Sequence, residues 1–136
     1  MKTFSDVFEE GGFLSDPFHE GFGMMTIHGV AKPVYRAYQL LHRTGKDRVA
    51  VTQVAGSNAT AGVFVISNGP EIMAIVYNHN IPTNPIKTET VCLQFSGINL
   101  MGKSAVLERI DDTHSNPTAV WKSMGSPGYI NSAQVT

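Results

Sequence analysis

The residues of this chain best suited to chemistry are two adjacent carboxylates close to its start. Glu9 and Glu10 follow a short strand-forming run, Thr3–Val7, and lie among several phenylalanines. Carboxylates accept hydrogen bonds from sugar hydroxyls, and aromatic rings cover the apolar face of a sugar. The aromatic neighbours are Phe4, Phe8, Phe13 and Phe18. This pattern is compatible with a carbohydrate site, and also with a solvated turn above packed aromatic side chains.

Other polar and aromatic residues extend the set of candidates. Asp6 and His19 lie near the carboxylate pair and would be acid–base groups if the chain is an enzyme. His79 and Asn80 lie in a loop with two prolines, which we interpret as a second recognition surface. Trp121 is either a platform for a ligand or an anchor that holds the C-terminal tail on the core. The candidate ligand-binding residues are Glu9, Glu10, Phe18, His19, His79, Asn80 and Trp121, and the candidate catalytic residues are Asp6, Glu9, Glu10 and His19.

The sequence lacks the usual signatures of cofactor-dependent or nucleophilic chemistry. It contains no phosphate-binding glycine loop, no nucleophile elbow and no zinc-type spacing of histidine and cysteine. The single cysteine, Cys92, can form neither an internal disulfide nor a thiolate metal site alone. We therefore expect no metal and no cofactor.

The composition is that of one soluble globular domain. Of the 136 residues, 42% are hydrophobic and 15% charged, and the formal net charge is −1. Because Lys and Arg form no cluster, we expect neither nucleic acid nor a membrane surface as a partner. No apolar run reaches the roughly 20 residues of a membrane span, and residues 1–20 do not resemble a signal peptide. We expect a soluble protein, cytoplasmic by default, whose location the sequence leaves unknown.

One amphipathic helix is expected over residues 32–42. Its apolar residues recur at i, i+3, i+4 and i+7, which places them in one stripe. Pro33 suits the first turn, where a missing N–H costs nothing, and Gly45 marks the end. The stripe consists of Val34, Ala37, Tyr38 and Leu41.

Beyond Lys46 the sequence becomes rich in strand-forming residues. The expected strands are Arg48–Val54, Gly62–Ser67, Glu71–Asn78, Thr88–Phe95 and Lys103–Ile110. Asn68-Gly69 predicts a hairpin because both residues tolerate positive φ, and Gly97–Gly102 is expected to close a second hairpin. Five strands at this spacing predict a small antiparallel sandwich or barrel. We take the fold class as mainly β, a small antiparallel β-sandwich with one amphipathic helix. Other expected elements are a short strand at 23–27, a long connection at 78–87 and a short helix at 119–124.

Two separated blocks of the chain carry recognisable motifs. The first comprises Phe4–Phe13 (FSDVFEEGGF), Pro17–Met25 (PFHEGFGMM) and Gly29–Leu41 (GVAKPVYRAYQLL). The second comprises Asp111–Pro117 (DDTHSNP), Trp121 and Met124–Pro127 (MGSP). In this order the blocks resemble the family 39 glycoside hydrolases, the relatives of β-xylosidase and α-L-iduronidase, and the resemblance covers the whole chain.

The resemblance implies a place within a larger architecture. The family has a (β/α)₈ barrel followed by a β-sandwich, and this chain resembles only the end of that arrangement. Residues 1–45 would be a remnant of the eighth barrel strand, its loop and the eighth helix. Residues 46–136 would be the β-sandwich with its C-terminal tail. Taken by itself, the chain 1–136 is expected to form a single domain.

The resemblance also implies a role for Glu9 and Glu10. Loops that follow the barrel strands form the active site, so these carboxylates would line the sugar subsite and contact hydroxyls. Retaining glycosidases cleave the bond with two other carboxylates about 5 Å apart. The family supplies those from the fourth and seventh barrel strands, which this chain does not resemble. We therefore expect no hydrolysis by this chain alone. This holds whether the chain is a dissected piece of a larger enzyme or a short protein that retains only the end of such an enzyme.

Three functions are compatible with these observations. The leading interpretation is a non-catalytic module, derived from a glycosidase, that binds carbohydrate or another small ligand or assembles with itself. The alternative is a fragment of a β-xylosidase-like hydrolase, or an enzyme with a new acid–base pocket around Glu9 and Glu10. The third is a purely structural role without a ligand, in which the sandwich buttresses a barrel or assembles with a partner. We expect self-association through the N-terminal apolar segment. That segment contributes Phe4, Val7, Phe8, Met24, Met25 and Ile27.

Overall fold

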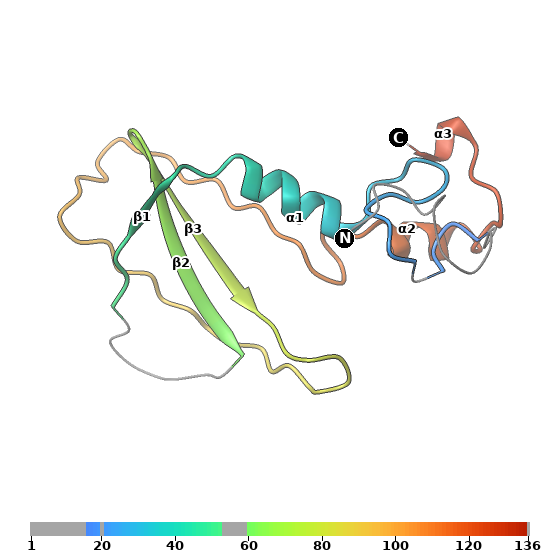
Figure 1. Ribbon diagram of the computed structural model, residues 1–136, viewed down its shortest axis with the longest axis horizontal. Helices are drawn as coiled ribbons and strands as arrows, with labels where there is room; N and C mark the ends of the chain where they lie inside the picture. The colour runs from blue at the N-terminus through green and yellow to red at the C-terminus, as the bar shows by residue number, and fades with distance from the viewer. Residues whose placement is uncertain (1–15, 20, 53–59, 136) are drawn as a thin grey trace. The chain divides into compact units, whose positions relative to one another are not determined.

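The computed structural model describes residues 16–19, 21–52 and 60–135 (Figure 1). In these ranges the elements are α1 (Pro33–His42), β1 (Asp47–Val49), β2 (Ala61–Asn68), β3 (Glu71–Asn78), α2 (Pro117–Ser123) and α3 (Ser132–Val135). They belong to two compact units. The first unit takes its described residues from the chain up to His42 and from Val106 onward, and the second from Arg43–Ala105. The expected strand Thr3–Val7 lies outside the described ranges.

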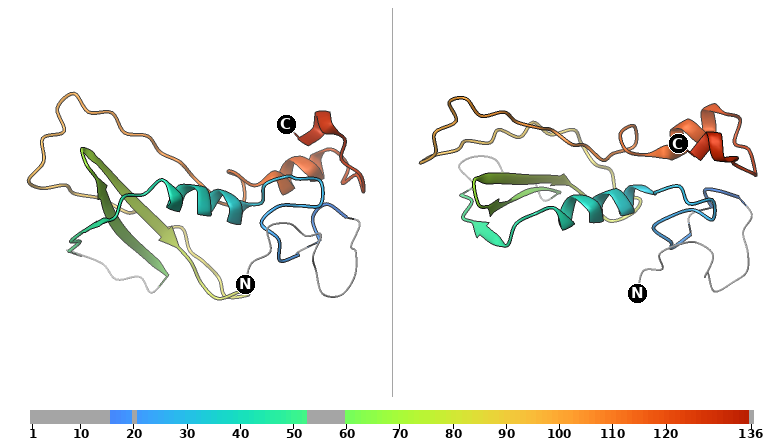
Figure 2. Two further views of the ribbon diagram at one scale, coloured as in Figure 1. Left: turned by 45° about the horizontal axis from the view of Figure 1, so that its top comes forward. Right: turned by 90° about the horizontal axis from the view of Figure 1, so that it is seen from above.

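The second unit contains an antiparallel sheet in the order β1-β2-β3 (Figures 1 and 2). A two-residue turn, Gly69-Pro70, joins β2 to β3, and the strands pair from Asn68 with Glu71 onward. The predicted hairpin is therefore confirmed. Positive φ is found at Gly69 (58°) and not at Asn68, as in a type II′ turn with glycine at its first central position.

Both faces of the β2–β3 hairpin carry apolar side chains. Cross-strand pairing places Val63 beside Val76 on one face and Phe64 beside Ile75 on the other. Val65 in β2 is buried, whereas Ile72, Val76 and Tyr77 in β3 are exposed. Strands that are apolar on both faces are typical of a sheet that is covered on both sides.

The expected fold class, mainly β with an amphipathic helix, is confirmed, but not every expected strand forms. In the part of the chain that the structure describes, one three-stranded sheet is present, and residues 88–95 and 103–110 form no strand. These two predictions were wrong because strand-forming side chains need a neighbouring strand to pair with, and the segments have none. The turn between them does form: both of its glycines have positive φ, and Lys103 N–H donates to Leu100 O at 3.1 Å.

The helix expected at 32–42 is confirmed as α1, which begins at Pro33. Of its apolar stripe, Val34 and Ala37 are half-buried, while Tyr38 and Leu41 are exposed. The apolar period therefore predicted the helix correctly. Within the described residues, only the N-terminal part of the apolar stripe is partly buried.

A close backbone approach sets the start of the sheet. Gly45 lies directly against the carbonyl group of Ser67 near the end of β2, two residues before β1 begins. A Cβ atom at Gly45 would lie 2.7 Å from the Ser67 carbonyl carbon and closer still to its oxygen. Only glycine can occupy this position without a displacement of the backbone.

Candidate functional site

The sequence candidates are distributed over both units and over residues outside the described ranges. Asp6, Glu9 and Glu10 lie outside these ranges, so their roles stay predictions. Phe18, His19 and Trp121 belong to the first unit, while His79 and Asn80 belong to the second. Phe18 and His19 from the start of the chain therefore share a unit with Trp121 from its end, and the loop after β3 belongs to the other unit.

Phe18 and Trp121 form an aromatic pair between the start and the end of the chain. Their ring centroids lie 5.2 Å apart with an interplanar angle of 50°, which is within the favourable range for aromatic contacts. The indole N–H of Trp121 donates to the carbonyl oxygen of Pro127 at 2.9 Å. Pro17, next to Phe18, is fully buried, and His19 is half-buried. These contacts favour the anchoring role of Trp121, and a direct contact with a ligand stays a prediction.

Helix α2, which carries Trp121, is capped at both ends. The Asn116 side chain accepts from Thr118 N–H at 3.1 Å, and Pro117 takes the first helical position. At the other end Gly125 has a φ of 83°, and Ser126 N–H donates to Trp121 O at 3.1 Å. This is the Schellman arrangement. The short helix expected at 119–124 is thus present as Pro117–Ser123.

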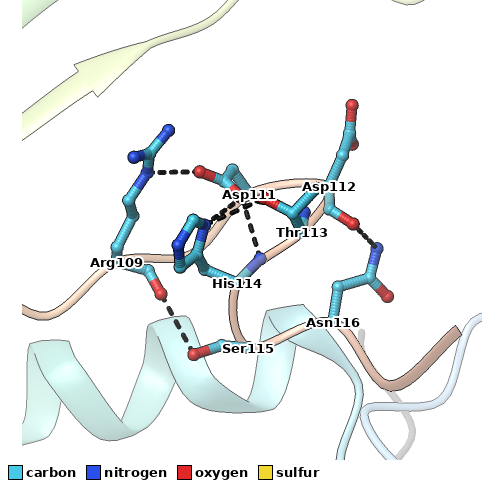
Figure 3. A network of polar contacts seen from close by, with 7 residues as sticks. All are labelled: Arg109, Asp111, Asp112, Thr113, His114, Ser115 and Asn116. Carbon is cyan, nitrogen blue, oxygen red and sulfur yellow. Dashed lines mark hydrogen bonds and ion pairs between the residues drawn. The ribbon is translucent and has the colours of Figure 1, made fainter. Parts of the chain in front are cut away.

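A polar turn leads the chain into α2 (Figure 3). Asp111 Oδ1 accepts from the backbone N–H groups of Thr113 and His114, both at 2.8 Å. It also accepts from the Thr113 hydroxyl at 3.0 Å and from His114 Nδ1 at 2.9 Å. Asp111 Oδ2 forms an ion pair with Arg109 Nε. The Asp111 carboxylate therefore organises the DDTHSNP motif, and both of its oxygens are engaged by neighbouring protein groups.

These bonds stabilise the ionised form of Asp111. The hydrogen bond from the His114 side chain, followed by that from the Thr113 backbone, holds the pKa of Asp111 well below its ordinary value of 3.8. Because the folded-state pKa is lowered, the contribution of Asp111 to stability is complete above its ordinary pKa. It is lost as the pH falls through the lowered value.

We expect the turn at residues 111–116 to loosen in acid in a way that depends on Asp111. Amide exchange at Thr113 and His114, compared with exchange elsewhere in the chain, should accelerate selectively below the ordinary pKa of Asp111. In Asp111→Asn the exchange should already be faster at neutral pH, and the selective acid effect should vanish. Asp112→Asn is the matched control, because that carboxylate points away from the cluster (Figure 3). Equal behaviour of the two variants would contradict this role.

The segment before α1 holds two features that the sequence reasoning missed. His28 packs edge-on against Tyr129, with centroids 5.2 Å apart and an interplanar angle of 82°. The buried Nε2 atom of His28 has no hydrogen-bond partner within the described ranges. Sequence offers no signal for this pair, because the two residues are distant in the chain and neither belongs to a periodic pattern.

The other feature is a tight turn around Thr26, which is 1% exposed. Thr26 N–H donates to Val30 O at 2.9 Å, and the Thr26 hydroxyl oxygen accepts from Val30 N–H at 3.1 Å. Gly29, with a φ of 79°, closes the turn. The strand expected at 23–27 is therefore wrong. Among the described residues its pairing is an isolated bridge between Met25 and Ala31, because the chain reverses too soon to extend a ladder.

The loop after β3 is held by its own side chains. The Asn80 amide donates to Pro85 O at 3.2 Å and its carbonyl accepts from Ile81 N–H at 2.9 Å. The Asn78 amide donates to Lys87 O at 2.7 Å. His79 is exposed. Asn80 thus has a structural role that its sequence context did not indicate, and binding of a ligand by His79 or Asn80 stays a prediction.

Within the described ranges, no three His, Cys, Asp or Glu side chains are grouped so that they could hold a metal ion. No helix of those ranges combines the length and the apolar character needed to cross a bilayer.

The first unit thus joins a loop near the chain start to a capped tail helix. The chain belongs to glycosyl hydrolases family 39, whose family model matches residues 1–136. It is 41% identical over 133 residues to a β-xylosidase from Caldicellulosiruptor saccharolyticus and 28% identical over 131 residues to one from Geobacillus stearothermophilus. These matches cover 98% and 93% of this chain, but only 27% and 24% of the relatives. No solved structure gives a significant match.

Proposed function

We propose that this chain is one portion of a larger β-xylosidase-like glycoside hydrolase and contributes to its sugar-binding side. The observation that carries the proposal is the family match over the whole chain, combined with relatives about four times as long. Both relatives are β-xylosidases, so the substrate class we propose is β-linked xylosides.

The apolar surface of the chain supports a larger context. Val65 and Ile130 are the buried hydrophobic residues among those described, whereas Met101, Val106 and Leu107 are each more than four-fifths exposed. Extensive exposed apolar surface marks a place where other protein packs. The β2–β3 hairpin supports the same conclusion, because both of its faces are apolar and would be covered by further protein in a larger enzyme.

The role we propose is binding and orientation rather than bond cleavage. Cleavage of a glycoside requires a pair of carboxylates at a defined separation across the scissile bond. Of the carboxylates in the described ranges, Asp111 is committed to its own turn. The resemblance to family 39 supports a role for Glu9 and Glu10 as hydrogen-bond acceptors beside the sugar, and we assign them that role in the larger protein.

A chimera tests this function. The matching segment of the C. saccharolyticus β-xylosidase is replaced by this chain, and hydrolysis of an aryl β-D-xyloside is measured. We expect turnover by the chimera and none by the 136-residue chain alone. Replacing Glu9 and Glu10 by Gln in the chimera should lower kcat/KM about tenfold to a hundredfold, the usual worth of hydrogen bonds to charged groups.

Glu71→Gln is the matched control, because Glu71 is an exposed carboxylate at the start of β3. An inactive chimera that folds normally would overturn the proposal. Saturable binding of xylo-oligosaccharides by the 136-residue chain, without turnover in the chimera, would instead favour a binding module. A mass by light scattering that corresponds to a dimer, with no response to sugars, would favour self-association.

A further inference from the structure

The loop near the chain start is attached to the C-terminal tail by two aromatic pairs. Phe18 contacts Trp121 and His28 contacts Tyr129, each with centroids 5.2 Å apart. All four residues belong to the first unit. Between Phe18 and α1 the described chain has one isolated bridge and the Thr26 turn, so the aromatic contacts add long-range attachment to a segment whose turn is held by local bonds.

Trp121 is the more firmly held partner of this attachment. Its indole N–H is bonded to Pro127 O, and its own carbonyl accepts from Ser126 N–H in the helix cap. Helix α2 has no buried residue, yet it is capped at both ends and preceded by the Asp111 turn. Because no residue of α2 is buried, these caps and hydrogen bonds contribute little to a hydrophobic core. Their effect is to hold the Trp121 ring in a fixed position.

We propose that Trp121 is a positioning residue for substrate: through Phe18 it fixes the place of the neighbouring His19 and of the loop that meets the sugar. The proposal rests on the proposed function, because it takes residues 18–19 to lie beside the sugar site. Trp121 itself need not contact the substrate for this role.

The physical basis is preorganisation. A loop that is ordered before the ligand arrives does not pay the cost of ordering when it binds, and the ligand binds more tightly. Loss of the Trp121 attachment should therefore weaken ground-state and transition-state binding alike, which raises KM and leaves kcat nearly unchanged.

The test uses Trp121→Phe, which keeps an aromatic ring against Phe18 but removes the N–H that bonds Pro127. In the active chimera we expect KM for the aryl β-xyloside to rise about threefold to tenfold, as for loss of one hydrogen bond, with an unchanged pH profile. Val120→Ala is the matched control: Val120 is the preceding residue of α2 and is 60% exposed. Phe18→Leu should also raise KM. In the double variant Phe18→Leu/Trp121→Phe, the fold increase in KM should be smaller than the product of the two single increases.

Hydrogen exchange on the 136-residue chain tests whether Trp121 orders the loop, independently of whether the chimera hydrolyses xylosides. Amides of residues 21–32 should exchange faster in Trp121→Phe than in Val120→Ala. If the unaltered chimera is inactive, the proposed function fails, and with it the role in substrate binding, whatever the exchange shows. If the chimera is active, unchanged KM in Trp121→Phe, or independent effects of the Phe18 and Trp121 variants, would overturn the positioning role. A lower melting temperature without a change in KM would show a structural role only.

Discussion

Gly45→Ala should destabilise the second unit by about 1–3 kcal/mol or more, the range for an overpacked site whose neighbours cannot yield. The alanine Cβ would meet the carbonyl group of Ser67, which is backbone. Ser67 is paired on both sides, with Asp47 in β1 and Ile72 in β3. It therefore cannot withdraw from the new methyl group without breaking pairs in the sheet.

The measurement is amide exchange in β2 and β3 together with urea unfolding followed by far-UV circular dichroism. Fluorescence would be misleading, because the one tryptophan of the chain lies in the first unit. Gly128→Ala is the control, since a Cβ there would meet only Asp16 Oδ1, at an ordinary 3.9 Å. The proposed steric cause is wrong if both variants unfold at the same urea concentration as the parent chain.

Thr26→Val should destabilise the first unit by about 1–2 kcal/mol, the lower part of the cost of leaving a donor without its acceptor, because the Val30 N–H is part-buried. Valine has nearly the shape of threonine, so packing is preserved, but Val30 N–H loses the hydroxyl oxygen at 3.1 Å. The turn that carries His28 toward Tyr129 is then closed by backbone bonds alone.

Thr26→Ser separates the two contributions of this side chain. Serine keeps the acceptor and loses one methyl group, so we expect it to be the less destabilising change. Tryptophan fluorescence is a suitable probe in this case, because Trp121 belongs to the same unit as Thr26. A serine variant less stable than the valine variant would mean that burial of the methyl group, rather than the hydrogen bond, stabilises the turn.

The elements that sequence predicted correctly are those with local causes. α1 follows from a 3.6-residue apolar period with proline at its start, and the β2–β3 hairpin follows from a glycine turn between two apolar runs. The strands expected at 88–95 and 103–110 depended on partners elsewhere in space. Their propensity is genuine, but propensity does not supply a pairing edge.

In the candidate site, too, features with local causes could be predicted from the sequence, whereas contacts between residues distant in the chain could not. Trp121 and Phe18 were recognised as noteworthy from residue type, but nothing in the sequence indicated that they touch each other. Asn80 is expected to contact a ligand, which stays a prediction, and its role in holding its own loop was not foreseen. The Asp111 turn had a readable signal in Asp followed by Thr two residues later, a common side-chain-to-backbone turn, and we took the motif only as a mark of resemblance.

The discontinuous make-up of the first unit has a consequence for its biosynthesis. Phe18 and Trp121 are separated by roughly one hundred residues, so their contact closes a long loop, which is costly in chain entropy and slow. The β2–β3 hairpin closes over two residues and can form as soon as it leaves the ribosome. The early loop therefore gains its contacts with Trp121 and Tyr129 only after the hairpin between them in sequence has been synthesised and can fold.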